Sequence, residues 1–355
     1  MKKVKLGELV SIQTGKLDAN AAVVGGKYPF FTTAKEISWI NDYVYDDEVV
    51  LVAGNGDLNV KYYKGKFNAY QRTYILSNNS NVRMKYLYYF LDKYIKVLRH
   101  QSIGGVIKYI KLNNLSNAQV PMMSIPEQEK IIKNLEKIDY LISKKSQQYT
   151  ELSKLVKSRF NEMFGDPVLN DMGWEIETLD KVGTIGRGVS KYRPRNASEL
   201  FGGIYPFIQT GDVANSGNYI VDYHSTYSEF GLKQSKLWDK GTLCITIAAN
   251  IAKTSILAFD SCFPDSIVGF IPGERTNNMF IHYWFSYFQK MLESQAPESA
   301  QKNINLKILS ELKVILPPLA LQNEFADFVA QVDKSQFACQ IVIKLWRNSL
   351  KSSII

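Results

Sequence analysis

The stretch IGGVIKYIKLNNLSNAQVPMMSIPEQEKI (residues 103–131) returns in the second half of the chain as ESAQKNINLKILSELKVILPPLALQ (residues 298–322). Residues around these stretches match at a constant offset of 194. Leu112, Leu115, Ser116, Val120, Gln128 and Asp139 pair with Leu306, Leu309, Ser310, Val314, Gln322 and Asp333. Solenoid repeats have periods of roughly 20–50 residues, so this much longer period predicts a duplicated domain.

Shorter matches extend the duplication toward the start of each copy. Tyr28-Pro29-Phe30 returns as Tyr205-Pro206-Phe207, and Leu6, Ile12 and Gly15 return as Leu179, Ile185 and Gly188 at an offset of 173. The change of offset indicates insertions in the first part of the second copy. Two diverged copies of one unit predict two similar surfaces, and therefore a ligand that is bound in two parts.

The composition is that of a soluble globular protein of 355 residues, with 45% hydrophobic and 22% charged residues. A prior of roughly 150 residues per domain allows two domains. The sequence contains neither an apolar run long enough to span a bilayer nor a typical signal peptide. Cysteines and histidines are scattered at Cys244, Cys262, Cys339, His100, His224 and His282. We therefore expect a cytoplasmic chain with no membrane segment, no metal and no cofactor of its own.

The net charge of +9 is typical of nucleic-acid binders, although unrelated proteins share it. Its distribution is uneven, because residues 1–123 carry +8 and residues 165–316 carry −2. We expect the second copy to rely on a local basic cluster, formed by Arg187, Lys191, Arg193 and Arg195.

Each copy opens with short runs of β-branched and aromatic residues bounded by turn residues, such as residues 48–53 and 242–249, which predict strands. Aromatic-rich helices follow at residues 85–98 and 279–292, and we interpret their rings as core. The fold class predicted is α+β. We expect globular domains at residues 1–125 and 165–318, a long central helix at 126–164 and a C-terminal one at 319–355.

A heptad pattern runs through both predicted long helices. Its apolar seam falls at Ile131, Leu135, Ile138, Ile142, Leu152 and Val156, and again at Leu321, Phe325, Phe328, Val332, Val342 and Trp346. This pattern, sustained over about four heptads, predicts two antiparallel helices paired as an intramolecular coiled coil. The alternative is two ordinary amphipathic helices packed on separate domains. A helix over residues 126–162 is about 55 Å long, enough to place the two globular units on DNA segments about a helical turn apart.

The sequence lacks the motifs of the enzymes that act on DNA. It has no GxxxxGK[ST] phosphate loop and no Asn-Pro-Pro-Tyr motif of an amino-methyltransferase. Pro264-Asp265 followed by Glu274-Arg275 lacks the lysine of a nuclease pattern. A duplicated, basic chain without catalytic groups predicts a recognition subunit.

These features together resemble the specificity subunit of type I restriction–modification systems, over essentially the whole chain. The resemblance rests on KLGELVSIQTGK (residues 5–16), TLDKVGTIGRG (178–188) and CFPDSIVGFIPG (262–273), and on the two duplicated stretches 103–131 and 298–322. The resemblance implies two target recognition domains, each reading half of a bipartite double-stranded DNA site, and a coiled coil that fixes the spacer. It also implies a non-enzymatic scaffold for two methyltransferase subunits that bring S-adenosylmethionine. Restriction subunits, which bring ATP hydrolysis and cleavage, can join.

The first copy departs from the family pattern in two places. Gly104-Gly105-Val106-Ile107 stands where the second copy has Ala300-Gln301-Lys302-Asn303. The arginine-rich run that follows Gly186 is absent after Gly15-Lys16. The DNA-contact residues that the family pattern implies can therefore be assigned less directly in the first copy than in the second.

Candidate DNA contacts are the Lys, Arg, Asn, Gln and Thr residues in loops beside the predicted strands, because these side chains bind phosphates and base edges. In the first copy they are Lys16, Lys35, Asn55, Asn59, Lys61, Gln71, Arg72 and Lys108. In the second they are Arg187, Lys191, Arg193, Arg195, Gln209, Thr210, Asn250, Lys253, Lys302 and Asn303. Each residue alone can equally be a solvated surface or turn residue.

Two other functions remain open from the sequence. The chain could be the recognition half of a restriction endonuclease or methyltransferase with its own activity, which the missing motifs disfavour. It could also be a helical adaptor whose globular parts bind protein. Steep salt dependence of binding would distinguish DNA from protein as the ligand.

Overall fold

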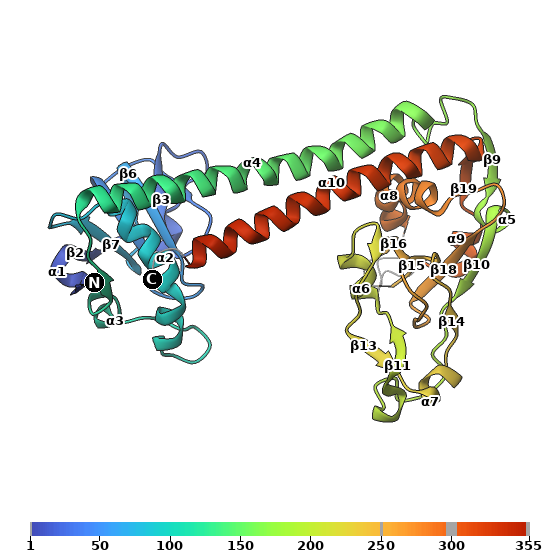
Figure 1. The fold of residues 1–355 in the computed structure, drawn as a ribbon, viewed down its shortest axis with the longest axis horizontal. Helices are drawn as coiled ribbons and strands as arrows, with labels where there is room; N and C mark the ends of the chain where they lie inside the picture. The colour runs from blue at the N-terminus through green and yellow to red at the C-terminus, as the bar shows by residue number, and fades with distance from the viewer. Residues whose placement is uncertain (1, 249–250, 296–303, 353–355) are drawn as a thin grey trace. The chain divides into compact units, whose positions relative to one another are not determined.

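The computed structural model of the chain describes residues 2–248, 251–295 and 304–352, with side chains outside 290–303 and 351–355 (Figure 1). The chain forms two compact units. The first unit comprises Met1–Gln147 with Cys339–Ile355, and the second comprises Gln148–Ala338. The fold is α+β, as the sequence predicts. Within the described residues, no helix has both the length and the apolar character needed to cross a bilayer.

The first unit is built on a six-stranded sheet of order β2-β7-β5-β6-β3-β4. Its strands are β2 (Val10–Thr14), β3 (Tyr28–Phe31), β4 (Ser38–Ile40), β5 (Tyr45–Ala53), β6 (Val60–Ala69) and β7 (Thr73–Asn78). Neighbouring strands are antiparallel, except that β3 and β6 are parallel to each other. A separate antiparallel pair joins β1 (Lys3–Lys5) to β8 (Gln119–Pro121), and the helices are α1 (Leu6–Leu9), α2 (Met84–Gln101) and α3 (Leu112–Ser116).

The second unit contains a five-stranded sheet, β10-β18-β15-β16-β12, and a four-stranded sheet, β13-β11-β17-β14. Its strands are β9 (Glu175–Thr178), β10 (Gly183–Arg187), β11 (Phe201–Phe207), β12 (Tyr219–Ile220), β13 (Ser225–Tyr227), β14 (Leu237–Trp238), β15 (Leu243–Thr246), β16 (Thr254–Leu257), β17 (Ser261–Cys262), β18 (Ile267–Pro272) and β19 (Lys313–Leu316). The shorter helices are α5 (Leu179–Val182), α6 (Thr210–Asn215), α7 (Glu229–Lys233), α8 (Asn278–Gln295) and α9 (Leu306–Ser310).

The two units share one topology, which confirms the predicted duplication. The order β2-β7-β5-β6 of the first unit corresponds to β10-β18-β15-β16 of the second, and the pair β1-β8 corresponds to β9-β19. The four-stranded sheet repeats further pairings of the first unit, because β11 is antiparallel to β13 and parallel to β17, as β3 is antiparallel to β4 and parallel to β6. Both aromatic-rich helices are core elements, as predicted. Tyr86 and Phe90 of α2, and Phe280 and Trp284 of α8, are buried.

Two long helices, α4 (Ile125–Phe164) and α10 (Leu319–Ser352), each begin in one unit and end in the other (Figure 1). Within the second unit they run antiparallel. Arg159 of α4 forms an ion pair with Glu324 of α10 at 2.9 Å, and Ser153 is hydrogen-bonded to Gln336 at 2.8 Å. The Phe325 ring contacts Phe160 edge-on, with ring centres 5.4 Å apart. Aromatic packing therefore joins the helices here.

The residues of the predicted seam are buried or partly buried along both helices. Beside Phe325 and Val332, however, the structure also buries Val329 completely, whereas Phe328 is only partly covered, with the Arg159 guanidinium over its ring. The apolar contact face of α10 in the second unit is thus wider than a strict heptad seam.

A buried glutamine ties each long helix to its own unit. Gln128 accepts a hydrogen bond from the Arg83 backbone N–H (2.9 Å) and donates one to the Met123 carbonyl (2.9 Å). Gln322, its counterpart in the duplication, accepts one from the Asn277 backbone N–H (2.9 Å). It also donates to the carbonyls of Arg275 and Pro317. Each glutamine therefore joins the start of a long helix to the start of the aromatic-rich helix.

Replacing Gln322 by alanine leaves three backbone groups without their partner. An unpaired buried polar group costs about 1–3 kcal/mol, so we expect Gln322→Ala to lower the free energy of unfolding by about 2–4 kcal/mol in urea titrations. The control is Gln331→Ala, an exposed position on the same helix, with an expected change below about 0.5 kcal/mol. Equal stability of the two variants would show that the buried amide is dispensable.

Candidate nucleic-acid interface

Hydrogen bonds link five loops of the first unit. They comprise residues 15–17, 32–35, 54–59, 70–72 and 103–110, and together we call them the first loop cluster. They contain seven of the eight candidate contact residues of the first copy, and the eighth, Lys61, lies near the start of β6.

Backbone hydrogen bonds hold these loops together. The Gly54 N–H donates to the Arg72 carbonyl (2.8 Å), and the Gly56 N–H donates to the Lys108 carbonyl (2.9 Å). The Gln71 N–H donates to the carbonyl of Leu17 (2.9 Å). Loops that are far apart in the sequence are thus fixed against one another without their side chains.

The second loop cluster comprises residues 188–196, 209–210, 247–248, 251–253 and 263–266 of the second unit. It contains Lys191, Arg193, Arg195, Gln209, Thr210 and Lys253, and Arg187 directly precedes it. The remaining candidates of the second copy, Asn250, Lys302 and Asn303, lie outside the described residues.

The same backbone hydrogen bonds build both clusters. Gly54 N–H to Arg72 carbonyl recurs as Ile247 N–H to Ser266 carbonyl (3.0 Å), and Gly15 N–H to Thr73 carbonyl recurs as Gly188 N–H to Ile267 carbonyl (2.8 Å). Ile110 N–H to Gly54 carbonyl recurs as Ile304 N–H to Ile247 carbonyl (3.0 Å). The two clusters are therefore equivalent sites on a duplicated scaffold.

Glycine is required at the first position of both clusters. A Cβ atom on Gly15 would lie 2.1 Å from the Ala69 carbonyl oxygen, and one on Gly188 would lie 2.3 Å from the Pro264 carbonyl oxygen. The duplicated Gly15 and Gly188 therefore record a close approach between backbones.

Several candidate residues in or beside the first loop cluster brace the loops. Lys35 forms an ion pair with Asp57 (3.1 Å), and this hydrogen-bonded lysine, together with Arg99, holds the pKa of Asp57 below its usual range. Asn59 donates to the Thr33 carbonyl (2.8 Å). Lys61 donates to the Ala34 carbonyl (2.6 Å), and burial lowers its pKa.

Other polar candidates of this cluster are available to a ligand. Lys16, Gln71, Arg72 and Lys108 are exposed, and none of these side chains has an ion pair or hydrogen bond within the described part of the chain. Asn55 is half-buried, and its backbone pairs with that of Tyr109. Exposed cations around a fixed backbone frame are the groups that bind a polyanion.

In the second cluster, Asp265 binds two of the three arginines. Arg195 forms an ion pair with the Asp265 carboxylate (2.7 Å), and Arg187 donates to the Asp265 carbonyl (2.5 Å). Arg193 donates to the Ser190 carbonyl (2.7 Å) within its own loop. The fourth residue of the predicted basic cluster, Lys191, is exposed and has no side-chain partner among the described residues.

The remaining candidates of the second cluster are partly engaged. Gln209 precedes α6, and its N–H donates to the Asp212 carboxylate (2.8 Å). Thr210 is the first residue of α6. The Lys253 ammonium is hydrogen-bonded to the Gln289 side chain (3.1 Å).

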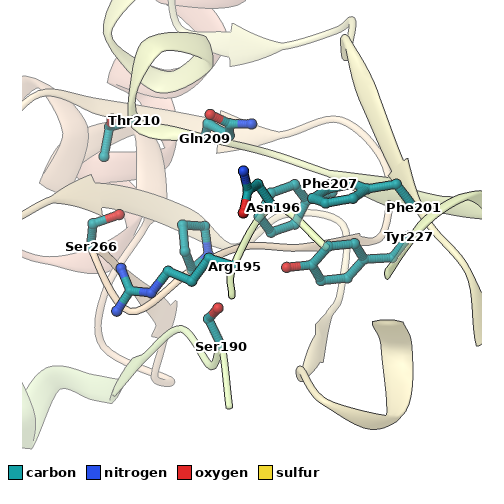
Figure 2. Close-up of a pocket in the computed structure, with 10 residues that line it drawn as sticks. Ser190, Arg195, Asn196, Phe201, Phe207, Gln209, Thr210, Tyr227 and Ser266 are labelled. Atoms are coloured by element: carbon teal, nitrogen blue, oxygen red, sulfur yellow. The ribbon is translucent and has the colours of Figure 1, made fainter. Parts of the chain in front are cut away.

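A cavity of about 370 Å³ opens in the second loop cluster (Figure 2). It is lined by Ser190, Arg195, Asn196, Phe201, Phe207, Gln209, Thr210, Tyr227, Pro264 and Ser266. Figure 2 shows the three aromatic rings together at one side and Thr210, Ser266 and the Arg195 guanidinium at the other. Phe207 and Tyr227 stack with ring centres 4.1 Å apart, and burial raises the Tyr227 pKa.

A depression of about 360 Å³ lies in the first cluster, lined by Thr14, Gly54, Gln71, Arg72, Tyr74, Tyr109, Ile110, Lys111 and Leu112. Arg72 and Ser266 are equivalent in the duplication, so the two hollows lie at corresponding places in the two units. The equivalent of Gln71 is Asp265, which sequence reasoning assigned only to an incomplete nuclease pattern. Asp265 could have been found from the sequence as the residue that corresponds to Gln71 at the offset of 194.

Comparison with known proteins identifies the family to which this duplicated chain belongs. The sequence matches the family profile of the type I restriction modification DNA specificity domain over residues 1–154 and 172–341. The chain belongs to this family of type I restriction–modification specificity subunits. The match in two segments follows the two copies.

Individual relatives agree with the assignment. The type I restriction enzyme EcoDI specificity subunit of Escherichia coli is 28% identical over 370 aligned residues, covering 93% of this chain and 81% of the relative. The putative MjaX specificity subunit of Methanocaldococcus jannaschii is 26% identical, covering 72% of this chain and 63% of the relative. The crystal structure of an S subunit from M. genitalium shares the fold, with a TM-score of 0.63, 17% identity, and coverage of 100% and 96%. The chain is thus a DNA sequence-recognition subunit and not itself the enzyme of its system.

Substituting Gly188 tests the close backbone approach in this specificity subunit. Since the added Cβ overlaps the Pro264 carbonyl, we expect Gly188→Ala to lower the free energy of unfolding by about 2 kcal/mol or more. Hydrogen exchange should increase in the second loop cluster and stay unchanged in the first. The control, Gly211→Ala, meets open space in α6, so its stability should be unchanged or slightly raised. If Gly188→Ala and Gly211→Ala show equal hydrogen exchange in the second loop cluster, the close backbone approach at position 188 does not require glycine.

Proposed function

We propose that each loop cluster of this specificity subunit reads one block of a bipartite double-stranded DNA site. The observation that carries the proposal is the recurrence of three backbone hydrogen bonds that hold equivalent loops in both units. Equivalent frames with different side chains bind the same kind of ligand with different specificity. Exposed cations such as Arg72 and Lys191 contact phosphates, while Gln71 and Gln209 reach base edges.

The two clusters read their blocks with different electrostatics. Residues 1–123 carry a net charge of +8, and the first cluster presents Lys16, Arg72 and Lys108 without partners among the described side chains. In the second, Asp265 holds Arg195, so this arginine reaches DNA only as part of an ion pair. Phosphate attraction therefore contributes more to binding by the first unit.

The long helices set the spacing between the blocks and carry two methyltransferase subunits in this proposal. Its support is that α4 and α10 are continuous across the boundary between the units. Each is a single rod, about 60 Å for the 40 residues of α4. Methyltransferase subunits supply S-adenosylmethionine, and restriction subunits, where present, supply ATP hydrolysis. This cytoplasmic chain supplies recognition and binds neither cofactor.

Mapping of methylated adenines tests the proposed function. The full chain is co-expressed with its methyltransferase subunit in a host without other adenine methylation, and methylated positions are determined genome-wide. We expect one motif with two specific blocks around a non-specific spacer of fixed length. Cells that express the methyltransferase alone are the control. A continuous motif, or methylation that does not depend on this chain, would contradict the proposal.

Lengthening both helices tests their role as a spacer. Seven residues are inserted after Ser146 in α4 and after Ala338 in α10, which keeps the heptad phase and adds about 10 Å. We expect the same two blocks with a spacer longer by about three base pairs, because base pairs rise by about 3.4 Å. An insertion of two residues in each helix serves as the out-of-phase control and should abolish assembly. An unchanged spacer in an active heptad variant would show that another element sets the distance.

A further inference from the structure

The loop between α2 and α3 forms a small braced hairpin. Ile103 and Tyr109 exchange backbone hydrogen bonds of 3.0 and 2.8 Å, and Gly104 makes the turn with a φ of +115°. A Cβ on Gly104 would lie 2.6 Å from the Ile107 carbonyl oxygen. The hairpin is also held by the Gly56 N–H, which donates to Lys108. The tip is therefore fixed in place by its backbone.

Two aliphatic side chains project from this tip. The exposure of Val106 is 104% and that of Ile107 is 63%, so neither contributes to the core. Exposed β-branched residues on a fixed tip leave apolar surface in water, which favours a ligand that covers them. The tip belongs to the first loop cluster, which also presents the exposed cations Arg72 and Lys108. A ligand that covers the tip is therefore one that these cations also contact, which favours DNA.

We propose that Val106 and Ile107 are specificity-determining residues that contact a thymine C5-methyl group in the DNA block read by the first unit. Aliphatic side chains cannot hydrogen-bond, so they cannot read the donors and acceptors of a base edge. The thymine methyl is the apolar group that bases present in the major groove. Flanking cations hold phosphates while the tip is desolvated against the base. This inference rests on the proposed function and extends it to one chemical feature of the site.

The sequence alone already marks this tip as different from the second copy. The second copy has no β-branched residue at the positions that correspond to Val106 and Ile107, and the residues of that second loop lie outside the described part of the chain. Readout of a methyl group by the tip is therefore expected for the first unit alone.

The test uses the full-length chain and duplex DNA that carries the mapped site. In one series, each thymine of the first unit's block is replaced singly by deoxyuridine, which lacks only the methyl group. Binding of the parent, of the double variant Val106→Ser/Ile107→Ser and of Arg72→Gln is measured by fluorescence anisotropy over a range of salt concentrations. Val24→Ser is the matched control, since Val24 is equally exposed (104%) but lies in the turn before Tyr28, at the far end of the β3–β4 hairpin from residues 32–35.

For the parent we expect one deoxyuridine to weaken binding about 10-fold, and the double variant to weaken binding to thymine DNA by about 10-fold or more. The double variant should no longer distinguish deoxyuridine from thymine, and its salt slope should equal that of the parent. Arg72→Gln should instead flatten the salt slope by about one phosphate contact. Val24→Ser should bind like the parent.

Three results would overturn the inference: binding by the double variant equal to the parent, deoxyuridine sensitivity that persists in the double variant, or a block without a deoxyuridine-sensitive thymine. Each of them leaves the proposed function intact as long as the parent binds the mapped site in a salt-dependent manner. Failure of the parent to bind DNA at all would instead contradict the proposed function itself. Thermal melting of each variant confirms that a loss of binding is not a loss of fold.

Discussion

The buried side-chain amides of Gln128 and Gln322 are the constraint on which each half of this protein depends. A buried amide must satisfy its hydrogen bonds, and each of these glutamines does so with backbone groups from two elements. The geometry is possible only when a long helix starts at a fixed place beside α2 or α8. Since those helices pack on the sheets, each glutamine fixes where α4 or α10 starts in its unit.

A second polar contact along each long helix supports the same arrangement. Asp139 of α4 accepts a hydrogen bond from Tyr89 (2.9 Å). Its counterpart, Asp333, accepts from Asn218 (2.8 Å), which in turn contacts Tyr283, the counterpart of Tyr89. In the second unit Asn218 also contacts His282, and burial lowers the pKa of His282 to about 4. This histidine is therefore neutral near pH 7, and the contact between helix and sheet carries no added charge there.

The duplication was predictable because it depends on residues whose roles are geometric. Gly15 and Gly188 are fixed by close backbone approach, and the two glutamines by buried hydrogen bonds, so these positions kept their identity in both copies. The four-stranded sheet of the second unit was not predicted. Strands of two or three residues, such as β14 and β17, are too short to show a period.

The loop residues show where reasoning from sequence ends. Lys61 and Arg72 are both cations in loops or beside them, yet Lys61 is held by a backbone carbonyl and Arg72 is exposed without a side-chain partner among the described residues. Only the folded positions of the loops distinguish the two. The sequence shows the exposed pair Val106 and Ile107 only as a departure from the second copy and not as a contact, because nucleic-acid contacts are predicted by residue type from polar side chains. Their significance comes from exposure on a braced tip.

Site-specific photo-crosslinking tests the central claim, two equivalent reading sites in one chain, most directly. A photo-reactive residue is placed at position 72 in one sample and at position 191 in another, and each full-length protein is bound to DNA carrying the mapped site. Equivalent reading sites predict that position 72 crosslinks within one specific block and position 191 within the other. Crosslinks from both positions to the same block, or only to the spacer, would contradict the claim.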